Sequence, residues 1–140
     1  MKWATRAGIH VDRAASAWLI ATYIDLDAVF VYVDDLDDVP TDATPFDMVG
    51  CDLSHHGEDV TFETILRRHD LADPVLWRMA EIGHQADVED ARFDAPEAAG
   101  LDTIIRELGL DHDDEQVRTT TAKILTSMEL YMRRETLGIA

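Results

Sequence analysis

The sequence is short of the features that mark secreted, membrane and thiol-based proteins. Its single cysteine, Cys51, excludes an internal disulfide and any paired-cysteine motif, and suits a reducing compartment. No apolar run approaches the roughly 18 residues that a membrane span needs, and the first residues form no signal-peptide core. It also has no glycine-rich phosphate loop and no nucleophile elbow. We therefore expect a soluble, cytoplasmic protein without a membrane partner.

Positive charge is scarce as well. Only 12 Lys and Arg stand against 29 Asp and Glu, giving a formal net charge of −17. Contact with phosphates needs a clustered basic surface, so we expect no direct binding to nucleic acid. Aspartate runs such as residues 34–38 favour a solvated, halophile-like surface, and an acidic ligand site is the alternative. Salt should stabilise such a surface by screening its repulsion.

The hydrophobic pattern divides the chain into a β-rich first half and an α-rich second half. Apolar and β-branched segments predict strands at residues 3–6, 28–33, 45–49 and 51–55, and a helix at 14–24 with Asp12 as its N-cap. Helical spacing predicts further helices at about 62–69, 74–88, 96–109 and from about 113, the first capped by Thr61. The last helix should turn Met128, Tyr131 and Met132 inward.

The length of 140 residues is close to the commonest size of one domain. We therefore predict a single domain over residues 1–140 of the α+β class, with a short sheet packed against a C-terminal bundle of about four helices.

The run of residues 52–58 carries the best candidates for chemistry. Alternate residues of an extended strand share one face, so His56 and Glu58 could point at the same ion. The side chain of His55 would then lie on the opposite face of the strand, where it could orient the metal ligands. His84 and Asp87, three apart on a predicted helix, could supply a second pair.

Imidazole and carboxylate together suit zinc, iron or manganese. The predicted metal site therefore comprises His55, His56, Glu58, His84 and Asp87. A simpler interpretation stays open, since adjacent histidines before a glycine occur in turns and a His three residues before an Asp is often a surface hydrogen bond.

Two arginines suggest an anion site. Arg6 and Arg13 flank the start of the first predicted helix, whose free N–H groups favour a small oxyanion. The favoured alternative is structural, with Asp12 as an N-cap and Arg13 as its ion-pair partner. Cys51 is expected to be a small buried hydrophobe, although a pair with His55 is possible.

Several short motifs, in this order, are similar to those of the chromate-resistance protein family of the ChrB type. They are residues 3–6 (WATR), 11–13 (VDR), 17–20 (AWLI), 54–58 (SHHGE), 61–63 (TFE) and 96–101 (PEAAGL). The resemblance implies the C-terminal domain of longer bacterial proteins that regulate or support chromate efflux in response to chromate.

Matched by position, the family's His-His-Gly motif falls on residues 55–57 and its Asp-Arg pair on Asp12 and Arg13. The match strengthens the expectation of a metal or oxyanion site. Relatives often carry cysteines where this chain has residues 16–17 (Ser-Ala) and Val60, so reduction of chromate by thiols is not implied here.

Three functions follow from these residues. The first is binding of a transition-metal ion, or of a small oxyanion such as chromate, for sensing or sequestration. The alternative is a metal-dependent redox or hydrolytic enzyme at the same site, with Glu58 or Asp12 as general base. DNA-binding regulation ranks last because of the charge. The apolar last helix could also support a homodimer.

Overall fold

The computed structural model describes residues 1–88, 90 and 92–138. Its strands are β1 (Lys2–Arg6), β2 (Val29–Val33) and β3 (Ala43–Pro45). Its α-helices are α1 (Val11–Leu19), α2 (Thr61–Arg68), α3 (Pro74–Asp87), α4 (Glu97–Asp111) and α5 (Asp114–Thr136). A π-helical turn, η1 (Ile20–Ile24), extends α1, and a 3-10 turn, η2 (Leu36–Asp38), follows β2. The α+β class is thus confirmed.

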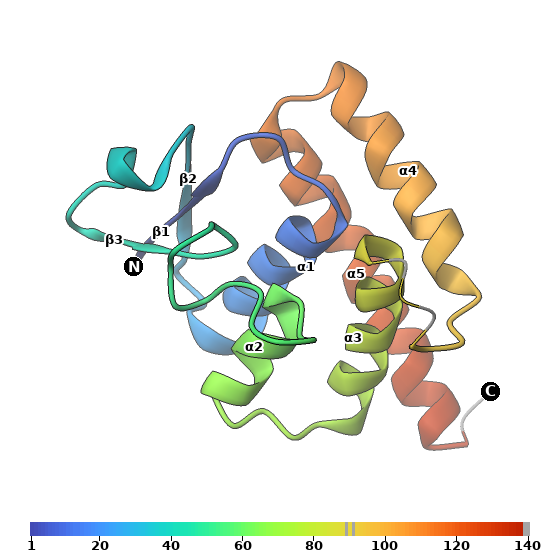
Figure 1. The fold of residues 1–140 in the computed structure, drawn as a ribbon. Helices are drawn as coiled ribbons and strands as arrows, with labels where there is room; N and C mark the ends of the chain where they lie inside the picture. The colour runs from blue at the N-terminus through green and yellow to red at the C-terminus, as the bar shows by residue number, and fades with distance from the viewer. Residues whose placement is uncertain (89, 91, 139–140) are drawn as a thin grey trace.

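The three strands form one parallel sheet in the order β2-β1-β3. Parallel neighbours cannot be joined by a tight hairpin, and here α1 connects β1 to β2. Figure 1 shows the sheet at one end of the molecule, α1 in the middle and α3, α4 and α5 at the other end. The carboxyl ends of all three strands consequently meet at one edge of the sheet.

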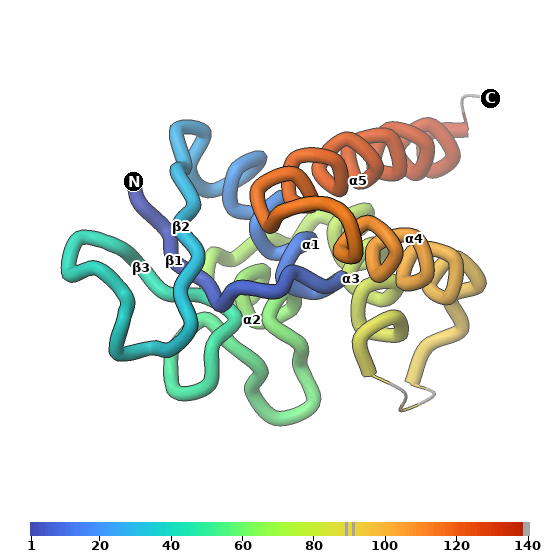
Figure 2. Tube along the Cα trace, turned by 90° about the horizontal axis from the view of Figure 1, so that it is seen from above, coloured from blue at the N-terminus to red at the C-terminus, as the bar shows by residue number. Residues whose placement is uncertain are grey.

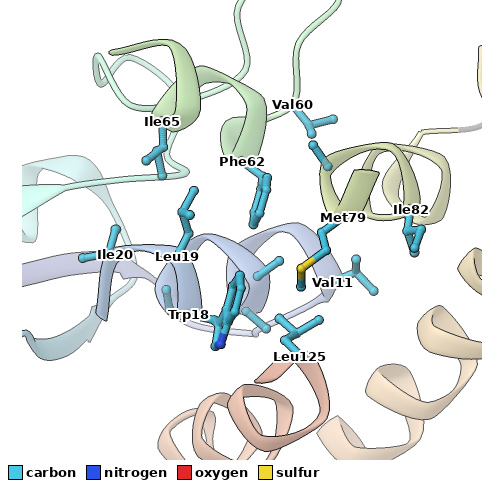
Figure 3. Packing of buried hydrophobic residues seen from close by; sticks show 14 of the residues in the cluster. Val11, Trp18, Leu19, Ile20, Val60, Phe62, Ile65, Met79, Ile82 and Leu125 are labelled. Atoms are coloured by element: carbon cyan, nitrogen blue, oxygen red, sulfur yellow. The ribbon is translucent and has the colours of Figure 1, made fainter. Parts of the chain in front are cut away.

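Helix α1 forms the centre of the hydrophobic core. It packs against α2, α3, α4 and α5, and most of its residues are buried. The Trp18 indole stacks on the Phe62 ring of α2, with centroids 6.5 Å apart, and its Nε1 donates to Thr126 of α5. Figure 3 shows Trp18 between Phe62, Met79 and Leu125, and Figure 2 shows α5 crossing beside α1. This packing holds α1 against the start of α2.

A helix begins where the sequence predicts if its capping residue directly precedes it in the sequence. Asp73 caps α3 by accepting from the Val75 N–H, and Pro74 occupies the first helical position. Asp113 and Gln116 form the predicted start of α5 through a reciprocal capping box. Helix α4, in contrast, continues past the glycine at 109 to Asp111.

Three expectations in the first half are wrong. The strand expected at residues 45–49 lies earlier in the chain, because β3 ends at Pro45. Residues 51–55 form no strand and contribute only the bridge between Phe46 and Leu53. Gly50 and Gly57 adopt positive φ values of 92° and 60°, which bend this segment into turns. The alternation of faces assumed for residues 52–58 therefore does not exist.

The first helix and one residue of the last also differ from expectation. Helix α1 begins at Val11, so Asp12 lies within its first turn instead of preceding it. In α5, Met132 is buried as predicted, but Tyr131 is 58% exposed. Among the helices that the structure describes, none is long and apolar enough to cross a membrane.

Candidate metal centre

The site is built around a buried carboxylate, Asp12, which caps a helix other than its own. Its Oδ2 accepts the Thr61 N–H at 3.0 Å, and its Oδ1 accepts the Phe62 N–H at 3.2 Å. The residue at the N-cap position of α2 is Val60, whose side chain cannot accept a hydrogen bond. Asp12 supplies that function from α1, and the positive end of the α2 dipole stabilises its negative charge.

His55 meets Asp12 from the irregular segment before α2. Its Nε2 lies 3.0 Å from the Oδ2 of Asp12 and 3.6 Å from the Oδ2 of Asp87, at the end of α3. The three donor atoms lie within 4.8 Å of one another, the only such group of three His, Cys, Asp or Glu side chains found in residues 1–88, 90 and 92–138. Asp12 is buried, while the His55 side chain is 49% exposed.

A third carboxylate, that of Asp47, borders this cluster. The Asp47 Oδ1 lies 3.8 Å from His55 Nε2 and accepts the Thr61 hydroxyl at 2.6 Å. Its Oδ2 accepts the Arg13 Nε–H at 2.9 Å. Asp47 has a φ of 52°, a left-handed conformation that Asp tolerates better than most residues. Arg13 also donates to the Gly8 carbonyl, so the segment before α1 is tied to the site.

The crowding of carboxylates shifts several pKa values. The hydrogen bond that the His55 ring donates to Asp12 raises the pKa of His55 to about 9, and the charges of Asp12, Asp47 and Asp87 raise it further. Burial, followed by the charge of Asp12, raises the pKa of Asp87 and brings that of Asp47 to about 6. Three carboxylates face the Arg13 guanidinium and, at neutral pH, the protonated His55 ring, which leaves one uncompensated negative charge, and two once the ring loses its proton. This excess favours a divalent cation between them.

Several predicted site residues lie elsewhere. His56 is exposed, and its Nε2 contacts the Asp52 carbonyl at 2.6 Å. Glu58 is 87% exposed on the turn closed by the backbone pair of His56 and Asp59. Neither belongs to the group of donor atoms around His55. The structure thus brings together two of the predicted metal ligands, His55 and Asp87, with Asp12, which the sequence predicts as an N-cap or general base and not as a ligand.

His84 is enclosed in a different environment. Its Nδ1 lies 2.5 Å from the Oε1 of Glu63, its Nε2 lies 2.7 Å from the Oδ2 of Asp90, and the side chain is fully buried. Burial lowers the pKa of His84, but the hydrogen bonds with Asp90 and Glu63 outweigh it and raise the pKa overall. Both ring nitrogens have carboxylate partners, which leaves no free donor atom for a metal in this arrangement.

The structure also shows where the remaining candidate residues, Arg13, Arg6 and Cys51, lie. Arg13 pairs with Asp47 and not with Asp12, since the Asp12 oxygens face α2. Arg6, at the end of β1, is exposed and lines a cavity that His55 and Arg13 also line. Cys51 is buried, its Sγ lies 3.5 Å from the Leu53 carbonyl, and burial raises the pKa of the thiol. It is therefore the small hydrophobe that the sequence predicts.

The sequence did not mark Asp47 as a site residue, and it predicted Arg13 as the ion-pair partner of Asp12. Acidic residues follow each observed strand: Asp12 after β1, Asp34 after β2 and Asp47 after β3. Asp47 was missed because the expected strand at 45–49 included it. Parallel strands bring such residues to one edge of the sheet, where ligands commonly bind.

The pKa of His55 offers a direct check of this geometry. In the metal-free protein, an NMR titration of the His55 ring should give a value near 9, compared with an ordinary value of 6.5. Asp12→Asn should lower that pKa, because it removes the charged acceptor. An unchanged pKa in this variant would contradict the pairing of His55 with Asp12.

The raised pKa of His55 also determines how its contribution to the stability of the fold changes with pH. A pKa raised in the folded state means that protonated His55 stabilises the fold below pH 6.5, and that this contribution is lost as the pH rises through about 9.

Fold and site together define the class of this protein. It is an α+β protein with an imidazole-carboxylate cluster at the carboxyl edge of a small parallel sheet. The chain belongs to the family described as ChrB, C-terminal domain, whose sequence model matches residues 3–132. Protein ChrB of Cupriavidus metallidurans is 37% identical over 105 residues, which cover 74% of this chain and 32% of that protein. No solved structure matches the chain.

The family points to chromate resistance or metal stress. The aligned part spans about a third of the length of the curated relative.

Proposed function

We propose that the chain binds a divalent transition-metal ion between Asp12, His55 and Asp87, and that it serves chromate resistance or metal stress by sensing or sequestering that ion. The observation that carries this proposal is the mutual approach of three donor atoms within 4.8 Å. Nitrogen and carboxylate donors suit zinc, iron or manganese.

The distances suit a small ion. In tetrahedral zinc sites with bonds of about 2.0–2.1 Å, donor atoms lie about 3.3 Å apart. The His55 Nε2 lies 3.0 Å from Asp12 and 3.6 Å from Asp87, so small side-chain shifts would accommodate the metal. An ionised carboxylate offers about four lone-pair positions, so Asp12 can bind a metal while it caps α2.

The oxyanion part of the proposal depends on the metal. Arg13 is engaged by Asp47, and the carboxylates of Asp34, Asp35 and Asp47 line the same cavity as Arg6. A dianion such as chromate would be repelled by these carboxylates if arginines alone held it. We propose that any oxyanion approaches through the cavity and is held by the metal, with Arg6 adding positive charge.

One feature favours the metal-dependent enzyme as a second candidate. Catalytic metal sites commonly use three protein ligands and leave a position open for water or substrate. Here three ligands converge, and the half-exposed His55 also lines the cavity. In this alternative Asp12 and His55 are metal ligands, while Glu58, at the exposed turn, lies outside the donor group.

A zinc titration of chelator-treated protein tests the proposal. We expect about one ion per chain for wild type, and at least about tenfold weaker binding for Asp87→Asn. Glu58→Gln is the matched control, because it neutralises an exposed carboxylate outside the cluster, and it should bind like wild type. Absence of zinc, iron and manganese binding by folded wild-type protein would refute the proposal.

A further inference from the structure

Strand β2 lies at one edge of the parallel sheet, with β1 on one side only. At its start the Val29 N–H donates to the Met1 carbonyl at 3.0 Å, and at its end the Val33 carbonyl accepts the Ala7 N–H at 2.8 Å. Backbone groups that face a given neighbour recur at every second residue of a parallel strand. Residues 29, 31 and 33 therefore bond to β1.

The two residues between them have free backbone groups. Phe30 and Tyr32 turn their N–H and C=O groups to the open side of β2, away from β1. Within residues 1–88, 90 and 92–138, no hydrogen bond engages these four groups. They can therefore pair with one further strand.

The side chains of β2 leave this edge approachable from one face of the sheet. Those of Phe30 and Tyr32 face the helices, where Arg118 lies over the Phe30 ring and Glu115 Oε2 lies 2.5 Å from the Tyr32 hydroxyl. Residues 29, 31 and 33 point to the opposite face. Val29 is 58% exposed, and the other two valines are half-buried. They form an apolar strip beside the free backbone groups.

The sequence of β2 has none of the residues that usually protect an edge strand. Such strands are commonly short or carry lysine or proline, which hinder the addition of another strand. Strand β3, at the other edge of the sheet, is three residues long and ends at Pro45. Strand β2 is five residues long and has the sequence VFVYV. It is therefore the edge that suits the addition of an extended peptide.

The charge around β2 indicates what kind of peptide would bind. Exposed aspartates stand on both sides of the strand, at position 27 before it and at positions 34, 35, 37 and 38 after it. No lysine, arginine or histidine occurs between Arg13 and His55. Arg6 of β1, in register with Val33, offsets only one of these charges. Basic residues at both ends of a peptide would complement the aspartates in either strand direction, whereas a second copy of β2 would repel them.

We propose that the open edge of β2 binds an extended segment of a partner protein, which adds a fourth strand to the sheet and carries basic residues on both sides of an apolar centre. Backbone bonds to Phe30 and Tyr32 would hold the segment, and the aspartates would select its charge. This inference does not depend on the metal centre, because none of the three proposed ligands lies in β2.

Amide hydrogen exchange, followed by NMR on the full chain, tests the proposal. The probe is acetyl-Lys-Lys-Val-Thr-Val-Thr-Val-Lys-Lys-amide at about 1 mM. It should slow exchange of the Phe30 and Tyr32 N–H groups at least about tenfold, and change that of Val31 little, since the Val31 N–H already bonds to β1. A peptide with glutamates for the lysines, and one N-methylated at its five central residues, should each bind at least about tenfold more weakly.

A charge variant tests the contribution of the aspartates. The double variant Asp27→Asn, Asp34→Asn should bind the basic peptide about fivefold more weakly, as expected for loss of exposed ion pairs, and should still bind zinc. The matched control, Glu81→Gln with Glu107→Gln, neutralises two exposed carboxylates of α3 and α4 and should bind the peptide like wild type.

Three results would overturn the inference, whatever the zinc result. They are unchanged exchange at Phe30 and Tyr32 with the basic peptide, equal binding of the acidic peptide, and protection of the same two amides by higher protein concentration alone. The last result would show that a second copy of the chain fills the edge.

Discussion

Replacing His84 with alanine is expected to lower the free energy of unfolding by about 3–5 kcal/mol, the typical loss when one partner of a buried ion pair is removed. His84 is fully buried, with Glu63 of α2 on one ring nitrogen and Asp90 on the other. Glu63 is itself buried, and its Oε1 also accepts the Val60 N–H at the start of α2. Without His84, that carboxylate would remain buried without its cation.

Chemical denaturation of the variants at neutral pH measures this effect. His69→Ala is the matched control, because His69 is exposed at the end of α2, and its expected change is within about 0.5 kcal/mol. Adding Glu63→Gln to His84→Ala should recover part of the loss, since it removes the buried charge and keeps an acceptor for Val60. A His84→Ala variant as stable as His69→Ala would contradict this role for His84.

Replacing His55 with alanine is expected to weaken zinc binding by at least about 100-fold, since loss of groups that merely orient a ligand already costs 10–100-fold. His55 supplies the only nitrogen of the donor group that includes Asp12 and Asp87. Its removal would also take away the ring that lies against the carboxylates of Asp12, Asp47 and Asp87.

His56→Ala is the sharpest control for this prediction, because it removes the adjacent imidazole, which is hydrogen-bonded to the Asp52 carbonyl and lies outside the donor group. It should bind zinc like wild type. Circular dichroism and thermal unfolding would show that both variants fold. The opposite outcome, with metal lost in His56→Ala and retained in His55→Ala, would support the strand-based assignment of ligands and contradict the one proposed here.

The parts of the fold that the sequence predicts are those determined by local interactions. Helices α3 and α5 begin at caps encoded by their own neighbours, Asp73 and Asp113. Strand β2 is a continuous β-branched and aromatic segment and lies where its composition places it. Family membership, seen in short motifs spread along the chain, is confirmed over residues 3–132.

The candidate site was less predictable because its geometry depends on tertiary contacts. Face alternation holds only for a strand that pairs along its length, and residues 51–58 turn at Gly57 instead. As a result His55, and not His56, meets Asp12. The capping of α2 by Asp12 joins residues 49 or 50 positions apart, and no local pattern encodes such a pairing.

The identity of the metal ligands can be tested most directly by crystallography of the zinc-loaded protein, with anomalous diffraction recorded at the zinc absorption edge. The account predicts a zinc peak bonded to His55 Nε2 and to carboxylate oxygens of Asp12 and Asp87, at about 2.0–2.2 Å from each. A peak at His56 and Glu58, or none beside His55 in zinc-loaded crystals, would contradict it.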